Sequence, residues 1–335
     1  MSEPSIAIAA DDAEVAAFRA AAAEIERRVG LSIVGQRAPI RGVLITLVLG
    51  AHALLEGVPG LGKTSMVQAF AHALGISHSR IQFTPDLMPA DITGTVVLVD
   101  NPEHAPTLVF QRGPLFGGLI LADEINRASP RTQSALLEAM QEGNVTIGNE
   151  THRLPRPFSV LATQNPVEMQ GTYPLPEAQL DRFLLKLQFD YPSVDELATI
   201  IRQTSLDAPL AASASGADEL VRMGELARHL PAASAVLDYV ARIVVALQPS
   251  EASPQIVRDY VRLGPSPRGA QALMLAGNVT ALLAGRHHLA YEDVRAVALP
   301  ALRHRLILTF DAERAGITAD DVVSAVLGDV PEDVR

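Results

Sequence analysis

The chain has 335 residues, which is enough for about two domains, and its excess of acidic over basic residues gives a net charge of -11. This charge and an aromatic content of 4% argue against a stand-alone nucleic-acid-binding protein, which normally carries a basic face. There are no cysteines, so disulfides, thiolate metal sites and cysteine nucleophiles are excluded.

No targeting or membrane segment is predicted. Residues 1–12 lack a basic region followed by an apolar core, which is the pattern of a secretion signal. The longest apolar run, residues 43–55, contains Thr46 and His52 and is shorter than the roughly 20 residues of a membrane helix. We therefore expect a soluble, cytoplasmic protein.

The amino-terminal elements lead to a glycine-rich loop. Residues 14–29 carry apolar and charged side chains at helical spacing and predict an amphipathic helix that Gly30 ends. Residues 41–49 predict a buried helix or a buried strand, because so short an apolar run does not distinguish the two. Residues 52–56 then predict a buried strand, and residues 65–74 predict a helix.

The loop between that strand and that helix fits the phosphate-loop pattern of a glycine, four free positions and Gly-Lys-Thr. Glycines let backbone N–H groups approach a phosphate closely, and the following helix directs its positive end at the same anion. We predict that Lys63 reaches the outer phosphates and that Thr64 binds Mg²⁺. The alternative is an ordinary Gly/Pro-rich turn. The predicted phosphate-loop residues are Gly57, Val58, Pro59, Gly60, Leu61, Gly62, Lys63, Thr64 and Ser65.

Strands and helices alternate in the middle of the chain, and only helices are predicted beyond residue 190. Ser129 and Pro130 begin the middle helix as N-cap and first residue. A capping box at residues 193–196 begins the helical part. The predicted strands are residues 80–84, 119–124, 158–162 and 185–189, with hairpins at 95–110 and 145–154. The predicted later helices are residues 219–229, 235–247, 268–284 and 292–299, after a linker at 208–216.

Polar residues at two strand ends are candidates for nucleotide chemistry. Asp123 and Glu124 end an apolar strand, and ligands of parallel α/β sheets collect at the carboxyl ends of strands. We predict that Asp123 holds Mg²⁺ through its water shell and that Glu124 polarises the attacking water; the alternative is a solvated pair. Asn165 follows the next buried strand, where it either orients that water or simply begins a turn before Pro166.

Two arginines are candidates for phosphate contacts. Arg182 suits the stabilisation of charge on transferred phosphate oxygens, and its alternative is a surface salt bridge with Asp181. Arg268 begins a helix, where a cation opposes the helix dipole unless an anion is near. No histidine has a metal-binding spacing, so we interpret His287, His288 and His304 as surface or loop histidines.

Together these motifs resemble those of the AAA+ ATPases and, within them, of the MoxR family. The resemblance covers about residues 31 to 306, and residues 121–183 are its most specific part. It implies an AAA+ α/β P-loop core in which helices flank a parallel sheet with β-hairpin insertions, plus a smaller all-α lid domain. The implied domains are an amino-terminal helix (1–30), the nucleotide-binding core (31–206) and the lid (207–335). The matching segments are residues 34–36, 57–64, 113–116, 121–128, 132–142, 161–166, 171–183 and 266–268.

The resemblance also implies roles and partners. Residues Val34 and Gly35 match the adenine-contacting segment, while Asp123 and Glu124 match the Walker B pair. The remaining matches are Asn165 with sensor 1, Arg268 with the sensor 2 arginine of the lid, and Arg182 with the arginine finger. Because such a finger acts on the next subunit's nucleotide, the resemblance implies a ring, usually a hexamer. Family members are thought to remodel client proteins with partners that carry von Willebrand factor A domains.

Three alternative functions agree with these motifs. The leading one is an ATP-hydrolysing, Mg²⁺-dependent ring that remodels a protein client. The second is an ATP-gated scaffold with negligible intrinsic hydrolysis, which turnover measured with and without clients would separate from the first. The third is a nucleic-acid motor related to replicative helicases; Arg153 and Arg156 are its only basic cluster near a hairpin, and no aromatic stacking platform lies beside them.

Overall fold

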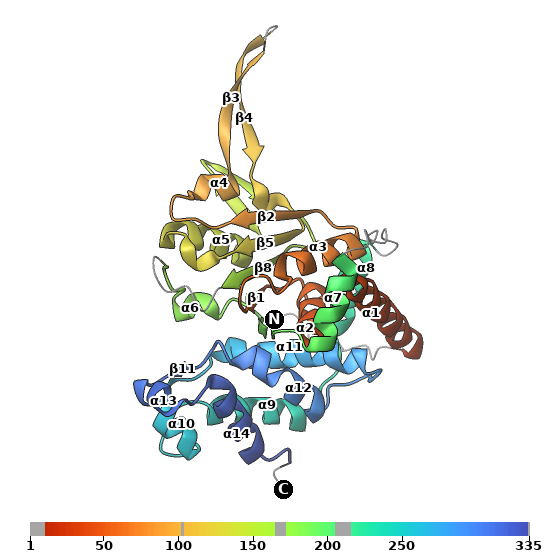
Figure 1. The fold of residues 1–335 in the computed structure, drawn as a ribbon, viewed down its shortest axis with the longest axis vertical. Coiled ribbons are helices and arrows are strands. Elements are labelled where there is room, and N and C mark those ends of the chain that lie inside the picture. The colour runs from red at the N-terminus through yellow and green to blue at the C-terminus, as the bar shows by residue number, and fades with distance from the viewer. Residues whose placement is uncertain (1–10, 102–103, 165–171, 205–215, 334–335) are drawn as a thin grey trace, which may run out of the picture.

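A computed structural model describes residues 11–101, 104–164, 172–204 and 216–333 (Figure 1). The α-helices of these residues are α1 (Asp12–Ser32), α2 (Arg37–Val48), α3 (Lys63–Leu74), α4 (Pro89–Thr93), α5 (Pro130–Glu142), α6 (Glu177–Leu180), α7 (Val194–Thr204), α8 (Ala217–Arg228), α9 (Ser234–Ala246), α10 (Gln255–Tyr260), α11 (Pro267–Leu283), α12 (Tyr291–Leu302), α13 (Phe310–Ala315) and α14 (Ala319–Asp329). The short 3₁₀ helices are η1 (Pro114–Phe116) and η2 (Ile125–Arg127). The strands are β1 (Ala53–Glu56), β2 (His78–Gln82), β3 (Gly94–Asn101), β4 (His104–Arg112), β5 (Leu119–Asp123), β6 (Asn144–Ile147), β7 (Glu150–Arg153), β8 (Ser159–Gln164), β9 (Leu185–Gln188), β10 (Val261–Leu263) and β11 (Ile307–Leu308).

A five-stranded parallel sheet forms the centre of the core. Its strand order is β2-β5-β8-β1-β9, and each neighbouring pair is parallel. All five strands therefore present their carboxyl ends at one edge of the sheet, where Glu56, Gln82, Asp123 and Gln164 end β1, β2, β5 and β8. The predicted parallel sheet with flanking helices is confirmed.

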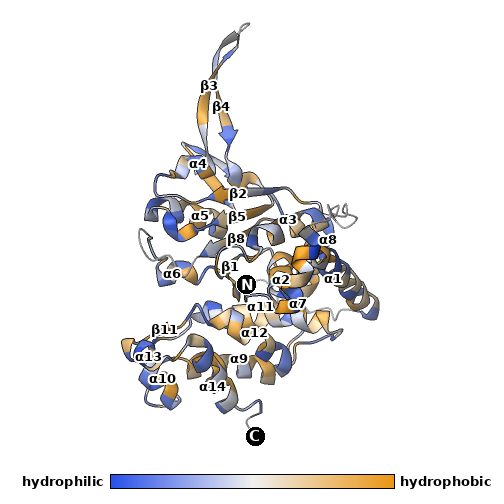
Figure 2. Ribbon diagram, in the orientation of Figure 1, coloured by the Kyte–Doolittle hydropathy of each residue, from blue (hydrophilic) through white to orange (hydrophobic). Residues whose placement is uncertain are grey.

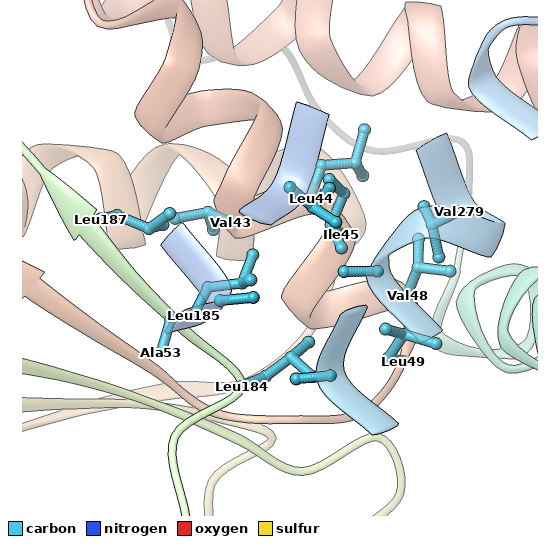
Figure 3. Packing of buried hydrophobic residues seen from close by; sticks show 14 of the residues in the cluster. Val43, Leu44, Ile45, Val48, Leu49, Ala53, Leu184, Leu185, Leu187 and Val279 are labelled. Carbon is cyan, nitrogen blue, oxygen red and sulfur yellow. The ribbon is translucent and has the colours of Figure 1, made fainter. Parts of the chain in front are cut away.

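Each face of the sheet is covered by its own hydrophobic cluster, because side chains alternate across a strand. Along β5, Leu121 belongs to one cluster, whereas Ile120 and Ala122 belong to the other. The first cluster packs α2 against β9, as Figure 3 shows for Val43 and Leu187. The second covers the face towards α5.

The carboxy-terminal helices form a lid that shares the first of these clusters. Buried apolar residues of α9, α11, α12 and α14 continue the cluster of α1, α2 and α3 without a break. Helix α11 packs against α1 and α2, and α1 also packs along α3. In Figure 3 Val279 of α11 lies beside Val48 and Leu49. The lid is thus joined to the core by apolar packing.

The first hairpin projects from the core as a long antiparallel ribbon (Figure 1). Its base packs on the body, since the Phe110 ring stacks on His152 at 4.2 Å and contacts Phe116 edge-on at 5.6 Å. Farther out, Leu98 opposes Leu108, and these side chains are 63% and 73% exposed. Apolar residues along β3 stand out in Figure 2.

Several sequence predictions need correction. Helix α1 continues past Gly30 to Ser32, because the N–H of Ile33 still donates to the carbonyl oxygen of Val29. The lid contains a short antiparallel pair, β10 and β11, that was too short to give an alternating pattern. His304 lies in the turn after α12, as a loop histidine, but it is 8% exposed and bonds the carbonyl oxygen of Phe183, so it is not a surface residue.

The ambiguity at residues 41–49 is resolved as a helix, because most of that segment lies within α2. Most of the predicted linker lies outside the described residues. Among the helices that the structure describes, none is both long and apolar enough to cross a membrane.

His52 is a buried histidine that the fold holds uncharged. Its Nδ1 accepts a hydrogen bond from the N–H of Val160 at 3.0 Å, and its Nε2 bonds the carbonyl oxygen of Met140 at 3.1 Å. Burial lowers the pKa of His52 from 6.5 to about 4. Between these two pKa values His52 is therefore neutral in the folded protein and protonated in the unfolded chain.

We expect the free energy of unfolding to decrease as the pH falls below 6.5, by about 3 kcal/mol through His52 when the pH reaches 4. The contribution is complete above the unfolded pKa and is lost towards the folded pKa, because the unfolded state then binds more protons. Urea unfolding across this range measures it. His52→Gln keeps an acceptor and a donor but has no group that titrates in this range, so it should show a shallower slope; an unchanged slope would contradict the assignment to His52.

Candidate nucleotide-binding site

The predicted phosphate loop connects β1 to α3, and two of its glycines show different reasons why glycine is required there. Gly62 has φ 81°, a left-handed conformation that side chains disfavour. At Gly57 an added Cβ would lie 2.9 Å from the Cβ of Phe189, so only glycine lets the loop lie this close to the residue after β9. Above Gly60 and Gly62, an added Cβ would meet no atom within 4 Å. The space over the loop is therefore open.

Lys63 is folded back over this loop. Its Nζ donates to the carbonyl oxygen of Gly57 at 2.5 Å. Burial lowers the pKa of Lys63, and the nearby carboxylates of Asp123 and Glu124 oppose that effect. The ammonium group thus stands beside the acidic strand end, where it would meet the outer phosphates of a nucleotide.

The loop and the strand ends enclose a cavity of about 390 Å³. Three adjoining strands of the sheet, β2, β5 and β8, contribute to its wall. The lining residues are Pro59, Gly60, Gly62, Lys63, Thr64, Ser65, Arg80, Gln82, Asp123, Glu124 and Thr163. An ammonium group, the start of a helix and two carboxylates therefore face one space.

Thr163 ties together the acidic pair at the end of β5. Its hydroxyl donates to Oδ1 of Asp123 at 2.6 Å and accepts from the N–H of Glu124 at 2.8 Å. Glu124 has φ 57°, the only positive φ of a non-glycine residue among the described residues. Such a conformation costs about 1–3 kcal/mol and persists only where the surroundings enforce it. Thr163 supplies part of that enforcement.

Both acidic side chains are engaged by neighbouring polar groups. Asp123 Oδ2 accepts from Arg80 Nη2 at 2.7 Å. Glu124 Oε2 accepts from Arg127 Nη1 at 2.7 Å and from Gln82 Nε2 at 3.1 Å. In this arrangement the Glu124 carboxylate is held by protein donors.

Comparison with known proteins agrees with this geometry. The family model described as "ATPase family associated with various cellular activities (AAA)" matches residues 52–185, and the "AAA lid domain" model matches residues 253–326. Chaperone MoxR1 of Mycobacterium tuberculosis (strain ATCC 25618 / H37Rv) is 43% identical over 316 residues, which cover 94% of this chain and 82% of that protein. The chain belongs to the MoxR family of AAA+ ATPases.

Two further relatives extend the likeness over nearly the whole chain. Protein MoxR of Methylorubrum extorquens is 34% identical over 337 residues, covering 96% of this chain and 97% of that protein. The crystal structure of a candidate ATPase from Cytophaga hutchinsonii is 36% identical, with a TM-score of 0.88 and coverage of 95% and 96%. Core and lid of this MoxR-family chain therefore have the arrangement of a solved relative.

The described residues of this MoxR-family protein fit a nucleotide with Mg²⁺. The open cavity over Gly60 and Gly62 has the positive lining that phosphates need, from Lys63 and the start of α3. The Thr64 hydroxyl and the Asp123 carboxylate line the same cavity, and oxygen ligands of this kind suit Mg²⁺.

Several predicted site residues do not line this cavity, and one is outside the described residues. Val34 and Gly35 do not line it; an added Cβ on Gly35 would lie 2.7 Å from Oε1 of Glu196, in the first turn of α7. Val58 and Leu61 are also absent from the lining, and Gly57 contributes only its carbonyl contact with Lys63. Asn165 lies outside the described residues.

The two predicted arginines are likewise separate from the phosphate loop. Arg182 lines another cavity of about 400 Å³, together with Glu138 and Glu142 of α5. Its alternative interpretation, an ion pair with Asp181, does not hold, since Asp181 pairs with Arg305. Arg268 is exposed in the first turn of α11, with its N–H bonded to Oγ of Ser266.

Sequence reasoning missed four residues that contact the acidic pair: Arg80, Gln82, Arg127 and Thr163. A signal existed for two of them. Arg80 and Gln82 alternate with Ile81 on the predicted strand, so they share one face. That this face meets Asp123 depends on the pairing of β2 with β5.

Thr163→Val should lower the free energy of unfolding by about 1–3 kcal/mol, because the part-buried carboxylate of Asp123 and the N–H of Glu124 both lose their hydroxyl partner. It should also lower ATP turnover, since Glu124 loses a support of its backbone. Urea unfolding and phosphate release measure the two effects. Thr163→Ser keeps the hydroxyl and serves as the control; equal stability of the Val and Ser variants would contradict this role.

Proposed function

We propose that this chain binds and hydrolyses ATP as one subunit of a cytoplasmic ring that remodels a protein client. The single observation that carries the proposal is the cavity in which the phosphate loop faces both carboxylates of β5. Its parts are those that phosphoryl transfer requires: a phosphate cradle with a lysine, metal ligands and a group that orients water.

The residues would divide the work as follows. The loop and Lys63 would bind and orient the phosphates. Mg²⁺ held by Thr64 and Asp123 would neutralise charge on the phosphate oxygens. Glu124 would orient the attacking water and accept its proton. Arg268 would contact the γ-phosphate from the lid, and Asn165 would help to orient the attacking water.

The ring is proposed from the position of Arg182. In the described structure this side chain lines a cavity beside α5 and does not line the cavity of its own phosphate loop. An arginine finger that acts on the next subunit's nucleotide needs such a position. We propose a hexamer, since family members usually form one.

A protein client is supported by the projecting hairpin of β3 and β4. Its outer part exposes apolar side chains on both faces, with Val99 and Val109 on one and Leu98 opposite Leu108 on the other. Exposed apolar surface of this kind marks protein-binding sites. One relative is named a chaperone. We further propose a partner with a von Willebrand factor A domain.

One observation favours a second candidate, the ATP-gated scaffold with negligible hydrolysis of its own. The Glu124 carboxylate is held by Gln82 and Arg127. A base that stays so engaged after ATP binds would not act on water. Release by a client or partner would then start hydrolysis.

The test is ATP turnover by purified protein, with and without Mg²⁺. We expect Mg²⁺-dependent phosphate release, and Lys63→Ala should weaken ATP binding and remove that release, because the outer phosphates lose their ammonium partner. Lys186→Ala is a control, because Lys186 pairs with Glu56 instead. Tight ATP binding without release in the wild type would favour the scaffold, whereas no ATP binding would contradict both.

A further inference from the structure

The lid binds the residue that immediately precedes Arg182. Asp181 Oδ2 accepts from the hydroxyl of Ser266 at 2.7 Å, and Asp181 Oδ1 accepts from Arg305 Nε at 2.9 Å. Ser266 stands at the start of α11, whereas Arg305 follows the end of α12. One carboxylate of the core is therefore shared by two separate elements of the lid.

The same lid residues also bind the backbone that follows Arg182. The guanidinium of Arg305 donates to the carbonyl oxygens of Phe183 at 2.7 Å and of Leu184 at 3.1 Å. His304 Nε2 bonds the same Phe183 oxygen at 2.9 Å. The segment of residues 181–184 is thus attached to the lid on both sides of Arg182.

Arg305 is buried, so this attachment is stiff. Its side chain is 3% exposed, and burial lowers its pKa while the charge of Asp181 opposes that effect. Removing one partner of a buried ion pair leaves a charge without compensation, which is strongly unfavourable. A displacement of the lid that left this segment in place would therefore have to break the buried ion pair.

The lid end of the attachment lies beside Arg268. Ser266 is the N-cap of α11, and its Oγ accepts the N–H of Arg268 while its hydroxyl donates to Asp181. The residue proposed to contact this subunit's γ-phosphate and the residue that binds Asp181 are thus joined through one side chain. A shift of the start of α11 reaches Asp181 directly.

We infer that Asp181 is a positioning residue through which the lid sets the place of Arg182, and so couples the nucleotide of one subunit to hydrolysis in its neighbour. The inference rests on the proposed function of Arg182 as a finger acting in trans. The side chain of Arg182 lies on the other side of the segment, in the cavity with Glu138 and Glu142. Its position is therefore set by the backbone that the lid holds.

The test uses mixed rings, in which an effect on a neighbour is separated from an effect on a subunit's own site. Wild-type subunits are mixed with a roughly fourfold excess of Glu124→Gln subunits, which bind ATP and hydrolyse little. The excess subunits carry either no further change or one of Asp181→Asn, Ser266→Ala, Arg182→Ala and Asp320→Asn. Turnover is expressed per wild-type subunit, and incorporation of each variant is checked by labelled subunits.

Excess Arg182→Ala subunits should lower turnover per wild-type subunit about fivefold, because most wild-type sites then face a neighbour without a finger. Asp181→Asn subunits should lower it about two- to fivefold. Ser266→Ala, which removes one of the two side-chain contacts, should give a smaller decrease in the same direction and remains informative if Asp181→Asn enters rings poorly.

The outcomes separate the inference from the proposed function. If Arg182→Ala lowers turnover but Asp181→Asn and Ser266→Ala do not, the inference is overturned and the finger stands. Unchanged turnover with Arg182→Ala would overturn the finger itself. Asp320→Asn is the matched control: Asp320 pairs with Arg303 at 2.9 Å within the lid and does not touch residues 181–184. An equal decrease in turnover with Asp320→Asn would show that the effect of Asp181→Asn comes from loss of lid stability, which would overturn the inference.

Discussion

Glu124→Gln should bind ATP as well as the wild type and turn it over about 10²–10⁴-fold more slowly. The amide retains the shape of the side chain and can still face Gln82 and Arg127, so the cavity is preserved. It has no basic oxygen to accept a proton from water. Binding measured by calorimetry and turnover measured by phosphate release should therefore separate in this variant.

Glu150→Gln provides the control, because Glu150 lies on the β6–β7 hairpin with its side chain 80% exposed. It should leave both binding and turnover unchanged. Unchanged turnover in Glu124→Gln would contradict the role of Glu124 as the base. Loss of ATP binding would instead show that this carboxylate is needed to form the nucleotide site.

Arg182→Ala should lower turnover about 10³–10⁵-fold in the assembled ring while leaving ATP binding by each subunit intact. An arginine that reaches transferred phosphate oxygens stabilises charge that develops only in the transition state. Because Arg182 does not line its own subunit's phosphate-loop cavity, its loss should not disturb nucleotide binding there. Turnover and ATP affinity of the homogeneous variant measure both effects.

Arg131→Ala is the matched control, since Arg131 is an exposed arginine of α5. It should retain wild-type turnover. A decrease in turnover that is accompanied by an equal loss of ATP affinity would place Arg182 in the structure of its own subunit and would contradict action on a neighbour.

Much of the fold could be predicted, because local patterns specify the elements. The continuous apolar runs of β5 and β8 and the turn signals of both hairpins depend on neighbours along the chain. The strands β10 and β11 could not be predicted, since two or three residues carry no period. The burial of the loop residue His304 could not be predicted either, because it depends on contact with Phe183, which is 121 residues away along the chain.

Part of the candidate site could likewise be predicted from the sequence, and part could not. The phosphate loop and the Asp123–Glu124 pair are contiguous stretches whose chemistry can be recognised without knowing their neighbours. Arg80, Gln82 and Thr163 contact that pair only because β2 and β8 flank β5 in the sheet. No local pattern specifies which strand lies next to which.

The sequence by itself determined that this protein carries a phosphate loop, a pair of carboxylates at a strand end and two arginines suited to phosphates. Those features follow from backbone freedom at glycine, from strand and helix periodicity and from side-chain chemistry, which are local properties. Only the tertiary structure decided that Gln82 and Arg127 hold Glu124 and that Arg305 and Ser266 join the lid to Asp181. Apart from the local Arg127 contact, these interactions join residues far apart in sequence, and packing of the sheet and the lid alone brings them within hydrogen-bonding distance.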